Sequence, residues 1–159
     1  MGCRMKQLNF LNTREVKKIR EQITAQFGFF PQGDYAFLQN DNDRLLMVNK
    51  DVAKLELKNL RIDRMGLYLG EMKPNHIRLS KEGAQLLVKL GGKKVTNIVD
   101  IDAQDVEIYF KGDDLTKDLG TENRLIILRY QNEILGCASY KEGKILNFLP
   151  KIHRGTVIV

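Results

Sequence analysis

Apolar residues recur at spacings of three and four in the first clear element of the chain, which predicts an amphipathic helix over residues 12–27. Asn12 can cap its first turn, Glu15 stands at the capping-box position, and Gly28 can end it. The apolar stripe consists of Val16, Ile19, Ile23 and Phe27, and much of the remaining surface carries Arg14, Lys17, Lys18 and Arg20. We interpret this basic face as a solvated one, with a polyanion-binding face as the alternative.

Short apolar segments follow this helix and predict antiparallel strands. Residues 35–38 and 45–48 flank the turn-forming run Asn40-Asp41-Asn42-Asp43, which predicts a hairpin. A calcium loop is the alternative for the two aspartates, but the glycine and the distal glutamate of that motif are missing. Further elements are expected as a short helix over residues 51–58, apolar segments at 60–62, 67–69 and 77–79, and a turn at residues 73–75.

The second half of the chain predicts two helices and a series of short strands. Ser80 can cap a helix that ends at Leu90, before Gly91-Gly92, and residues 103–110 predict a second helix closed by Gly112. Strands are expected at residues 95–101, 125–130, 134–140, 144–148 and 156–159, with tight turns at residues 131–132 and 142–143. Short strands this close together favour a small barrel, since closure removes exposed sheet edges. We therefore predict an α+β fold, with an α+β amino-terminal domain over residues 1–73 and a β-barrel domain over residues 74–159.

The charge balance points toward an acidic partner. The chain has 26 Lys and Arg against 20 Asp and Glu, a net charge of +6, and its pI is about 9.3. Such a field attracts polyanions, nucleic acid first and anionic membrane second. The membrane is the weaker candidate, because no apolar run approaches the roughly 18 residues that a spanning helix needs and no signal peptide is recognisable. Two cysteines, Cys3 and Cys137, form no disulfide framework, which favours a reducing, cytoplasmic setting.

Positive charge is concentrated near the carboxy terminus. Lys141, Lys144, Lys151 and Arg154 are opposed only by Glu142 in this segment, and the aromatic residues Tyr140 and Phe148 are interleaved with them. A groove built from these residues can hold phosphates by charge and offer a ring to an unstacked base. The alternative is that both aromatic side chains belong to the barrel core and the lysines are solvated turn residues.

The same segment carries a family resemblance. The order Leu135-Gly136, a glycine turn, Lys144 to Asn147, Pro150-Lys151 and Arg154 resembles the carboxy-terminal PUA-like domain of the fmu/Sun-type ribosomal RNA cytosine methyltransferases. Upstream, residues 64–71 (RMGLYLGE) resemble the stretch that precedes this domain, and residues 78–87 resemble its following helix. The resemblance covers roughly residues 61–155. It departs at Cys137 and Leu149, where those domains often have aromatic residues.

This resemblance implies a PUA-like barrel and RNA binding, to ribosomal or transfer RNA. Small stand-alone proteins of the archaeal NOL/NOP/fmu ribosome-biogenesis group are similar in organisation, and the two-domain Nip-type ribosome-assembly factors are more distantly similar. An RNA-modifying enzyme or a ribosome-assembly factor is then a candidate protein partner.

The residues themselves do not suggest catalysis. A methyltransferase needs a nucleotide-binding α/β core with a glycine-rich turn, and the chain has no such segment. The family's cysteine nucleophile follows a proline, whereas Cys3 and Cys137 each follow a glycine, and we expect Cys137 to pack in a strand. An acidic neighbourhood, Asp100, Asp102, Asp105, Asp113 and Asp114, can be interpreted as a metal or acid–base site, but helix capping is favoured. We expect no enzyme, no cofactor and no metal.

The favoured hypothesis is therefore a non-catalytic RNA-binding protein that acts in ribosome biogenesis or RNA modification. Phosphate contacts are expected from Lys141, Lys144, Lys151 and Arg154, base or 2′-hydroxyl contacts from Asn147 and His153, stacking from Tyr140, and an extension of the track from Arg78, Lys93 and Lys94. The main alternative is a protein-interaction adaptor in an RNA-processing assembly. A third is a small-ligand-binding relative, which would need a deep apolar pocket.

Overall fold

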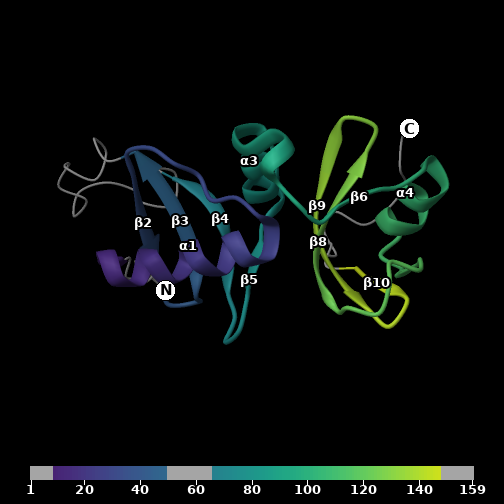
Figure 1. Ribbon diagram of the computed structural model, residues 1–159, viewed down its shortest axis with the longest axis horizontal. Coiled ribbons are helices and arrows are strands. Elements are labelled where there is room, and N and C mark those ends of the chain that lie inside the picture. The colour runs from purple at the N-terminus through teal and green to yellow at the C-terminus, as the bar shows by residue number, and fades with distance from the viewer. Residues whose placement is uncertain (1–8, 50–65, 148–159) are drawn as a thin grey trace, which may run out of the picture.

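The computed structural model describes residues 9–49 and 66–147 of the 159-residue chain, and these residues form two five-stranded sheets with helices between and around them. The expected helix at 51–58, the expected strands at 60–62 and 156–159, and the site residues Lys151, His153 and Arg154 lie outside the described residues. The architecture is α+β, as predicted (Figure 1).

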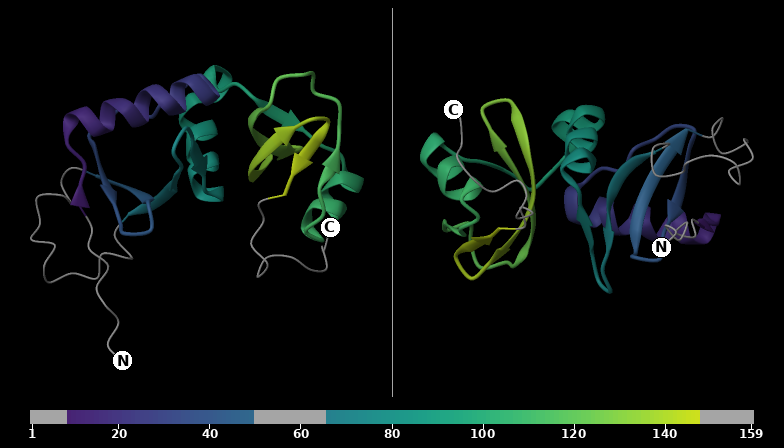
Figure 2. Two further views of the ribbon diagram at one scale, coloured as in Figure 1. Left: turned by 90° about the horizontal axis from the view of Figure 1, so that it is seen from below. Right: turned by 180° about the vertical axis from the view of Figure 1, so that it is seen from behind.

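The first sheet is an antiparallel meander with one helix across it. Its order is β1-β2-β3-β4-β5, built from β1 (Asn9–Phe10), β2 (Tyr35–Gln39), β3 (Arg44–Asn49), β4 (Leu67–Met72) and β5 (Ile77–Leu79). Helix α1 (Thr13–Phe27) covers one face of this sheet (Figure 2). It buries Ile19, Ile23 and Phe27, each worth about 1.5–3 kcal/mol when removed from water. The predicted helix and the predicted hairpin at 35–48 are both confirmed.

Local interactions set the ends of α1 as its sequence predicts. The Asn12 side chain accepts a hydrogen bond from the backbone N–H of Glu15 (2.9 Å), and the Glu15 carboxylate accepts one from Asn12 (3.1 Å). Gly28 ends the helix with a φ of 78°. A β-carbon at Gly28 would stand 2.9 Å from the carbonyl oxygen of Lys94, so glycine also permits the later chain to cross the helix end.

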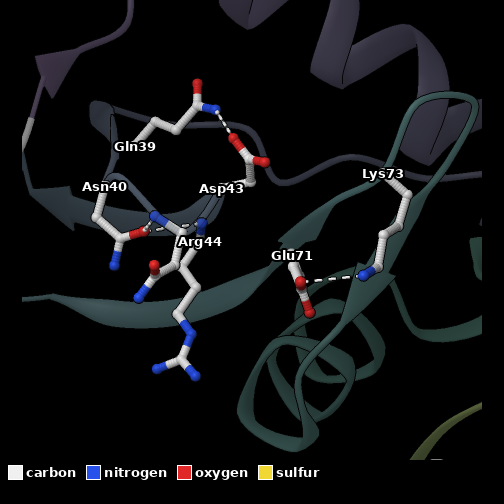
Figure 3. Close-up of polar contacts among 7 residues, drawn as sticks. Gln39, Asn40, Asp43, Arg44, Glu71 and Lys73 are labelled. Atoms are coloured by element: carbon white, nitrogen blue, oxygen red, sulfur yellow. Dashed lines mark hydrogen bonds and ion pairs between the residues drawn. The ribbon is translucent and has the colours of Figure 1, made fainter.

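The turn between β2 and β3 is closed by side chains of its own residues. Asn40 Oδ1 accepts hydrogen bonds from the backbone N–H groups of Asn42 (2.9 Å) and Arg44 (3.0 Å), and Asp43 Oδ1 accepts one from Gln39 Nε2 (3.1 Å) (Figure 3). Asp43 has a φ of 58°, a conformation that Asn and Asp tolerate better than most residues. The turn interpretation of this run is therefore confirmed.

The second sheet curls into a half-barrel. Its order is β6-β8-β9-β10-β7, from β6 (Ile98–Asp100), β7 (Leu115–Thr116), β8 (Arg124–Tyr130), β9 (Glu133–Lys141) and β10 (Lys144–Leu146). Among the strands of the described ranges, only β6 pairs in parallel, with β8. Helix α4 (Ala103–Phe110) lies against the side of this sheet that faces away from the first sheet (Figure 1). The single strand expected over residues 95–101 is wrong at its start, because Asn97 has a φ of 61° and the strand begins at Ile98.

Helix α3 (Lys81–Gly91) joins the two sheets (Figure 1). It packs on β4 and on β9, and one apolar cluster contains Leu79 of β5, Leu87 of α3, and Ile127 and Cys137 of the second sheet. The 3-10 helix η3 (Gly92–Lys94) then leads to β6. A division after residue 73 would separate β4 from β5, its hydrogen-bonded neighbour, whereas the chain changes sheets only between η3 and β6.

Candidate nucleic-acid interface

The tip of the β9–β10 hairpin presents two of the predicted cations. Lys141 and Lys144 are exposed and directly opposite each other in the strand register. The turn between them places Glu142 at a φ of 50° and Gly143 at a φ of 80°, as a two-residue hairpin turn requires. Like charges directly opposite each other repel, so a bound anion would relieve a strain already present in the free protein. Neither lysine forms an ion pair with any residue in the described ranges.

Tyr140 precedes this tip, but its ring is in the core. The side chain is 1% exposed, and its hydroxyl donates to the Gly120 carbonyl (2.7 Å) while accepting from the Leu119 N–H (2.9 Å). The Arg124 guanidinium lies over the ring, 5.3 Å from its centre. The prediction that Tyr140 stacks on a base is therefore wrong; the residue instead holds the 119–124 loop against the sheet. Apolar packing of the ring, the alternative drawn from the sequence, is confirmed.

Asn147 is also occupied within the protein. Its side-chain nitrogen donates to the carbonyls of Tyr109 (2.6 Å) and Asp113 (2.9 Å), and its backbone N–H donates to Asp114 Oδ1 (2.9 Å). Both amide hydrogens are thus used to tie the end of β10 to the end of α4. The prediction that this amide donates to a base is therefore wrong, because the amide instead positions the end of β10 against the end of α4.

Arg78 is not grouped with the hairpin lysines. It lies on β5 of the first sheet, half-buried, with Glu71 of β4 opposite it in the register. Burial raises the pKa of Tyr109 and of Cys137 to about 12 each, and the positive charge of Arg78 opposes both increases. Arg78 therefore belongs to the first sheet, whereas Lys141 and Lys144 belong to the second.

Cys137 behaves as the small apolar residue that we expected. It lies within β9, is 5% exposed and packs in the cluster shared by the two sheets. With its thiol pKa at about 12, the nucleophilic thiolate is scarce at neutral pH.

Lys93 and Lys94 are exposed on η3, and Lys94 lies beside the end of α1. The backbone N–H of Thr96 donates to the carbonyl of Phe27 (2.6 Å), which holds η3 beside the Gly28 cap. There Lys94 lines a cleft of about 840 Å³ together with two cations of α1, Lys17 and Arg20. Sequence reasoning treated these α1 cations as solvated. Their spacing of three residues, followed by Phe29 and Phe30 just beyond the helix, is the signal in the sequence from which the cleft could have been found.

A second cleft lies where α1 meets the second sheet, and hydrogen bonds hold its polar lining. Gln26 Nε2 donates to the Ile77 carbonyl (2.8 Å), and the Ile77 N–H donates to Gln26 Oε1 (2.9 Å). Asn97 Nδ2 then donates to the Gln26 carbonyl (2.6 Å), and Arg124 Nε donates to Asn97 Oδ1 (3.2 Å). These three side chains, with His76, line a volume of about 940 Å³. The hydrogen-bonding groups of these side chains link β5, α1 and β8 to one another.

The acidic neighbourhood is used for structure. Asp102 and Asp105 form a reciprocal capping box at the start of α4, which confirms the capping interpretation. Asp105 also pairs with Lys117 (3.0 Å). Asp100 accepts two hydrogen bonds from Arg129 (2.6 and 2.9 Å), and these hold the pKa of its carboxyl below the usual range. Within residues 9–49 and 66–147, no group of three or more His, Cys, Asp or Glu side chains has the arrangement of a metal site.

Comparison with known proteins gives a relation for the second sheet. Residues 96–154 match the model of the Methyltransferase RsmF PUA domain. Two proteins of Vibrio cholerae serotype O1, from strains M66-2 and ATCC 39315 / El Tor Inaba N16961, are both named ribosomal RNA small subunit methyltransferase F. Each is 22% identical to this chain over 143 residues, which is 90% of this chain and 29% of the relative.

These findings confirm the predicted resemblance to the PUA-like domain of fmu/Sun-type methyltransferases, and the half-barrel is PUA-like. The similarity also extends over most of the first sheet, since the alignment covers 90% of the chain. The chain spans less than a third of the length of the methyltransferases that it matches. The relation to the archaeal NOL/NOP/fmu group stays a prediction. None of the helices described here is long and apolar enough to cross a membrane.

Proposed function

We propose that this chain is a non-catalytic RNA-binding protein, which contacts ribosomal or transfer RNA through its PUA-like half-barrel in the course of RNA modification or ribosome biogenesis. The match of residues 96–154 to the PUA domain of a ribosomal RNA methyltransferase carries the proposal. The exposed and mutually repelling Lys141 and Lys144, which form no ion pair with a described residue, support it, because they are placed to contact phosphates at the end of that half-barrel. We propose a division between the amino-terminal and PUA-like units near residue 95.

The proposal extends to further RNA contacts, to the absence of catalysis and to the cellular setting. Lys151, His153 and Arg154, which follow β10 in sequence, are proposed as further RNA contacts, and Lys93 and Lys94 as a separate cationic contact. Catalysis is not part of the proposed role, since the Cys137 thiol is buried with its pKa at about 12. A cytoplasmic setting is proposed because RNA of these classes is its partner.

The adaptor alternative lacks an apolar docking surface within the described residues. Their large exposed apolar side chains, Phe10, Leu90 and Ile108, lie on β1, α3 and α4 and form no shared patch. The small-ligand alternative would need a deep apolar pocket, whereas the two clefts described above carry cations or committed polar side chains.

The test is the salt dependence of binding to a structured fragment of small-subunit ribosomal RNA transcribed in vitro. Contact with about four phosphates of a single-stranded part of the fragment, at about 0.7 per phosphate, predicts a log–log slope near −3, and the triple variant Lys144→Ala, Lys151→Ala and Arg154→Ala should flatten it by about 2. A matched control removes three exposed lysines elsewhere, Lys81, Lys89 and Lys111, and should keep most of the slope. Equal slopes for the triple variant and the wild type would exclude this surface.

Pull-down from nuclease-treated extract separates the adaptor from the RNA-binding protein. Partners retained without RNA, together with no direct shift of the ribosomal fragment, would contradict the proposed function. Crosslinking followed by RNA sequencing would then identify the RNA and the contacted site.

A further inference from the structure

The cleft beside α1 is a second cationic surface, distinct from the hairpin of the half-barrel. One wall is a single stripe of α1, because Thr13, Lys17, Arg20 and Thr24 follow each other at spacings of four, three and four. The other wall is the segment from Phe29 to Phe37, which includes Phe29, Gln32 and Tyr35, and Lys94 of η3 completes the lining. The residues of three separate elements thus enclose about 840 Å³, within the range of roughly 300–1,000 Å³ found for ligand pockets.

The charge of this cleft is one-sided. Among the described residues that line it, Lys17, Arg20 and Lys94 are cationic and none is acidic. Lys17 and Lys94 are exposed and form no ion pair with the described part of the chain. The nearest acidic residue before Lys17 on α1, Glu15, is held in the capping box. An anionic ligand would therefore enter without displacing a protein carboxylate from these two lysines.

Aromatic groups accompany the cations. Arg20 lies over the ring of Phe30, 5.7 Å from its centre, which fixes the guanidinium at the cleft wall. Phe29 and Tyr35 are partly exposed in the same lining, and the Tyr35 hydroxyl makes no hydrogen bond to a described residue. A combination of cations with accessible ring faces suits a nucleic-acid strand whose bases are unstacked, since each base has a face that can stack on a ring.

From this arrangement we propose that the cleft between α1 and the Phe29–Phe37 segment binds a single-stranded stretch of RNA, with Lys17, Arg20 and Lys94 on its phosphates and Tyr35 against a base. The proposal rests on the proposed function only for the class of ligand. Its site lies on the first sheet and helix α1, outside the residues that match the PUA domain. The chain then contacts RNA twice, through structured RNA at the half-barrel and an unpaired segment at the cleft.

The experiment measures binding of fluorescently labelled oligouridine to the full chain over a range of salt concentrations. The double variant Lys17→Ala and Lys94→Ala should flatten the log–log slope by about 1.4, since each single-strand phosphate contact contributes about 0.7. Tyr35→Ala should weaken binding at least about fivefold with the slope unchanged, because it removes a stacking surface and no charge. The matched control, Lys81→Ala with Lys111→Ala, removes the same charge from α3 and the end of α4 and should bind as the wild type does.

The outcomes separate this inference from the proposed function. Oligouridine binding that is unchanged in the Lys17/Lys94 variant, or absent from the wild type, would overturn the cleft as an RNA site. The proposed RNA contact of the half-barrel would remain supported in either case if its own triple variant still flattened the salt slope for the ribosomal fragment. Selective binding of polyglutamate in place of oligouridine would also overturn the inference, since it would assign the cleft to an acidic peptide. Both lysines are exposed, so their variant remains informative if Tyr35→Ala fails to fold.

Discussion

Replacement of Tyr140 by phenylalanine tests whether the hydroxyl of this residue holds the 119–124 loop or contacts RNA. The change removes only the hydroxyl, which bridges the Leu119 N–H and the Gly120 carbonyl at 2.9 and 2.7 Å. A net hydrogen bond contributes about 0.5–1.5 kcal/mol, and Gly120 is exposed, so water can replace part of the loss. We expect the free energy of unfolding to fall by about 1–2 kcal/mol. For a chain of this size, that is a decrease in Tm of roughly 2–8 °C.

The assay pairs thermal and urea unfolding with binding to the ribosomal fragment well below the Tm. Because the ring is buried, we expect RNA affinity to be unchanged in Tyr140→Phe while the free energy of unfolding falls. Tyr130→Phe is the matched control. Among the described residues, the Tyr130 hydroxyl accepts only a long hydrogen bond from Gln131 (3.4 Å) at an exposed site, so the change should alter stability by less than about 0.5 kcal/mol. Full stability combined with weaker RNA binding in Tyr140→Phe would refute the core assignment.

Three further predictions concern residues that connect neighbouring elements of the fold. Gln26→Ala should lower the free energy of unfolding by about 1–3 kcal/mol in urea titrations, because both backbone groups of Ile77 lose their partner. The hydrogen bond from Arg129 lowers the pKa of Asp100 in the folded protein. The ionised carboxylate therefore stabilises the fold above the ordinary carboxyl pKa, and this contribution is lost as pH falls through the lowered value. We expect the difference in urea midpoint between the wild type and Asp100→Asn to shrink in acid. Cys137, with its pKa at about 12, should react with a thiol reagent at pH 8 only after unfolding, and rapid labelling of the native chain at this residue would contradict its burial.

The local elements could be predicted from the sequence because short-range interactions determine them. The capping box at Asn12 and Glu15, the left-handed stop at Gly28 and the cap at Asp102 all involve residues three or four positions apart or a single backbone conformation. Each of these was expected and is present. The PUA-like relation was recognisable for the same kind of reason, since an ordered series of short motifs survives in the linear chain.

Only the tertiary structure decided which of those residues share a surface. Tyr140 alternates with cations in sequence, yet strand alternation and the 119–124 loop bury its ring, and Asn147 is taken up by the end of α4. Conversely, Lys17 and Lys94 are far apart in the chain and line the same cleft, because Thr96, just after η3, is hydrogen-bonded to Phe27 at the end of α1. Exposure and proximity depend on contacts between distant segments, and no periodicity within one segment contains that information.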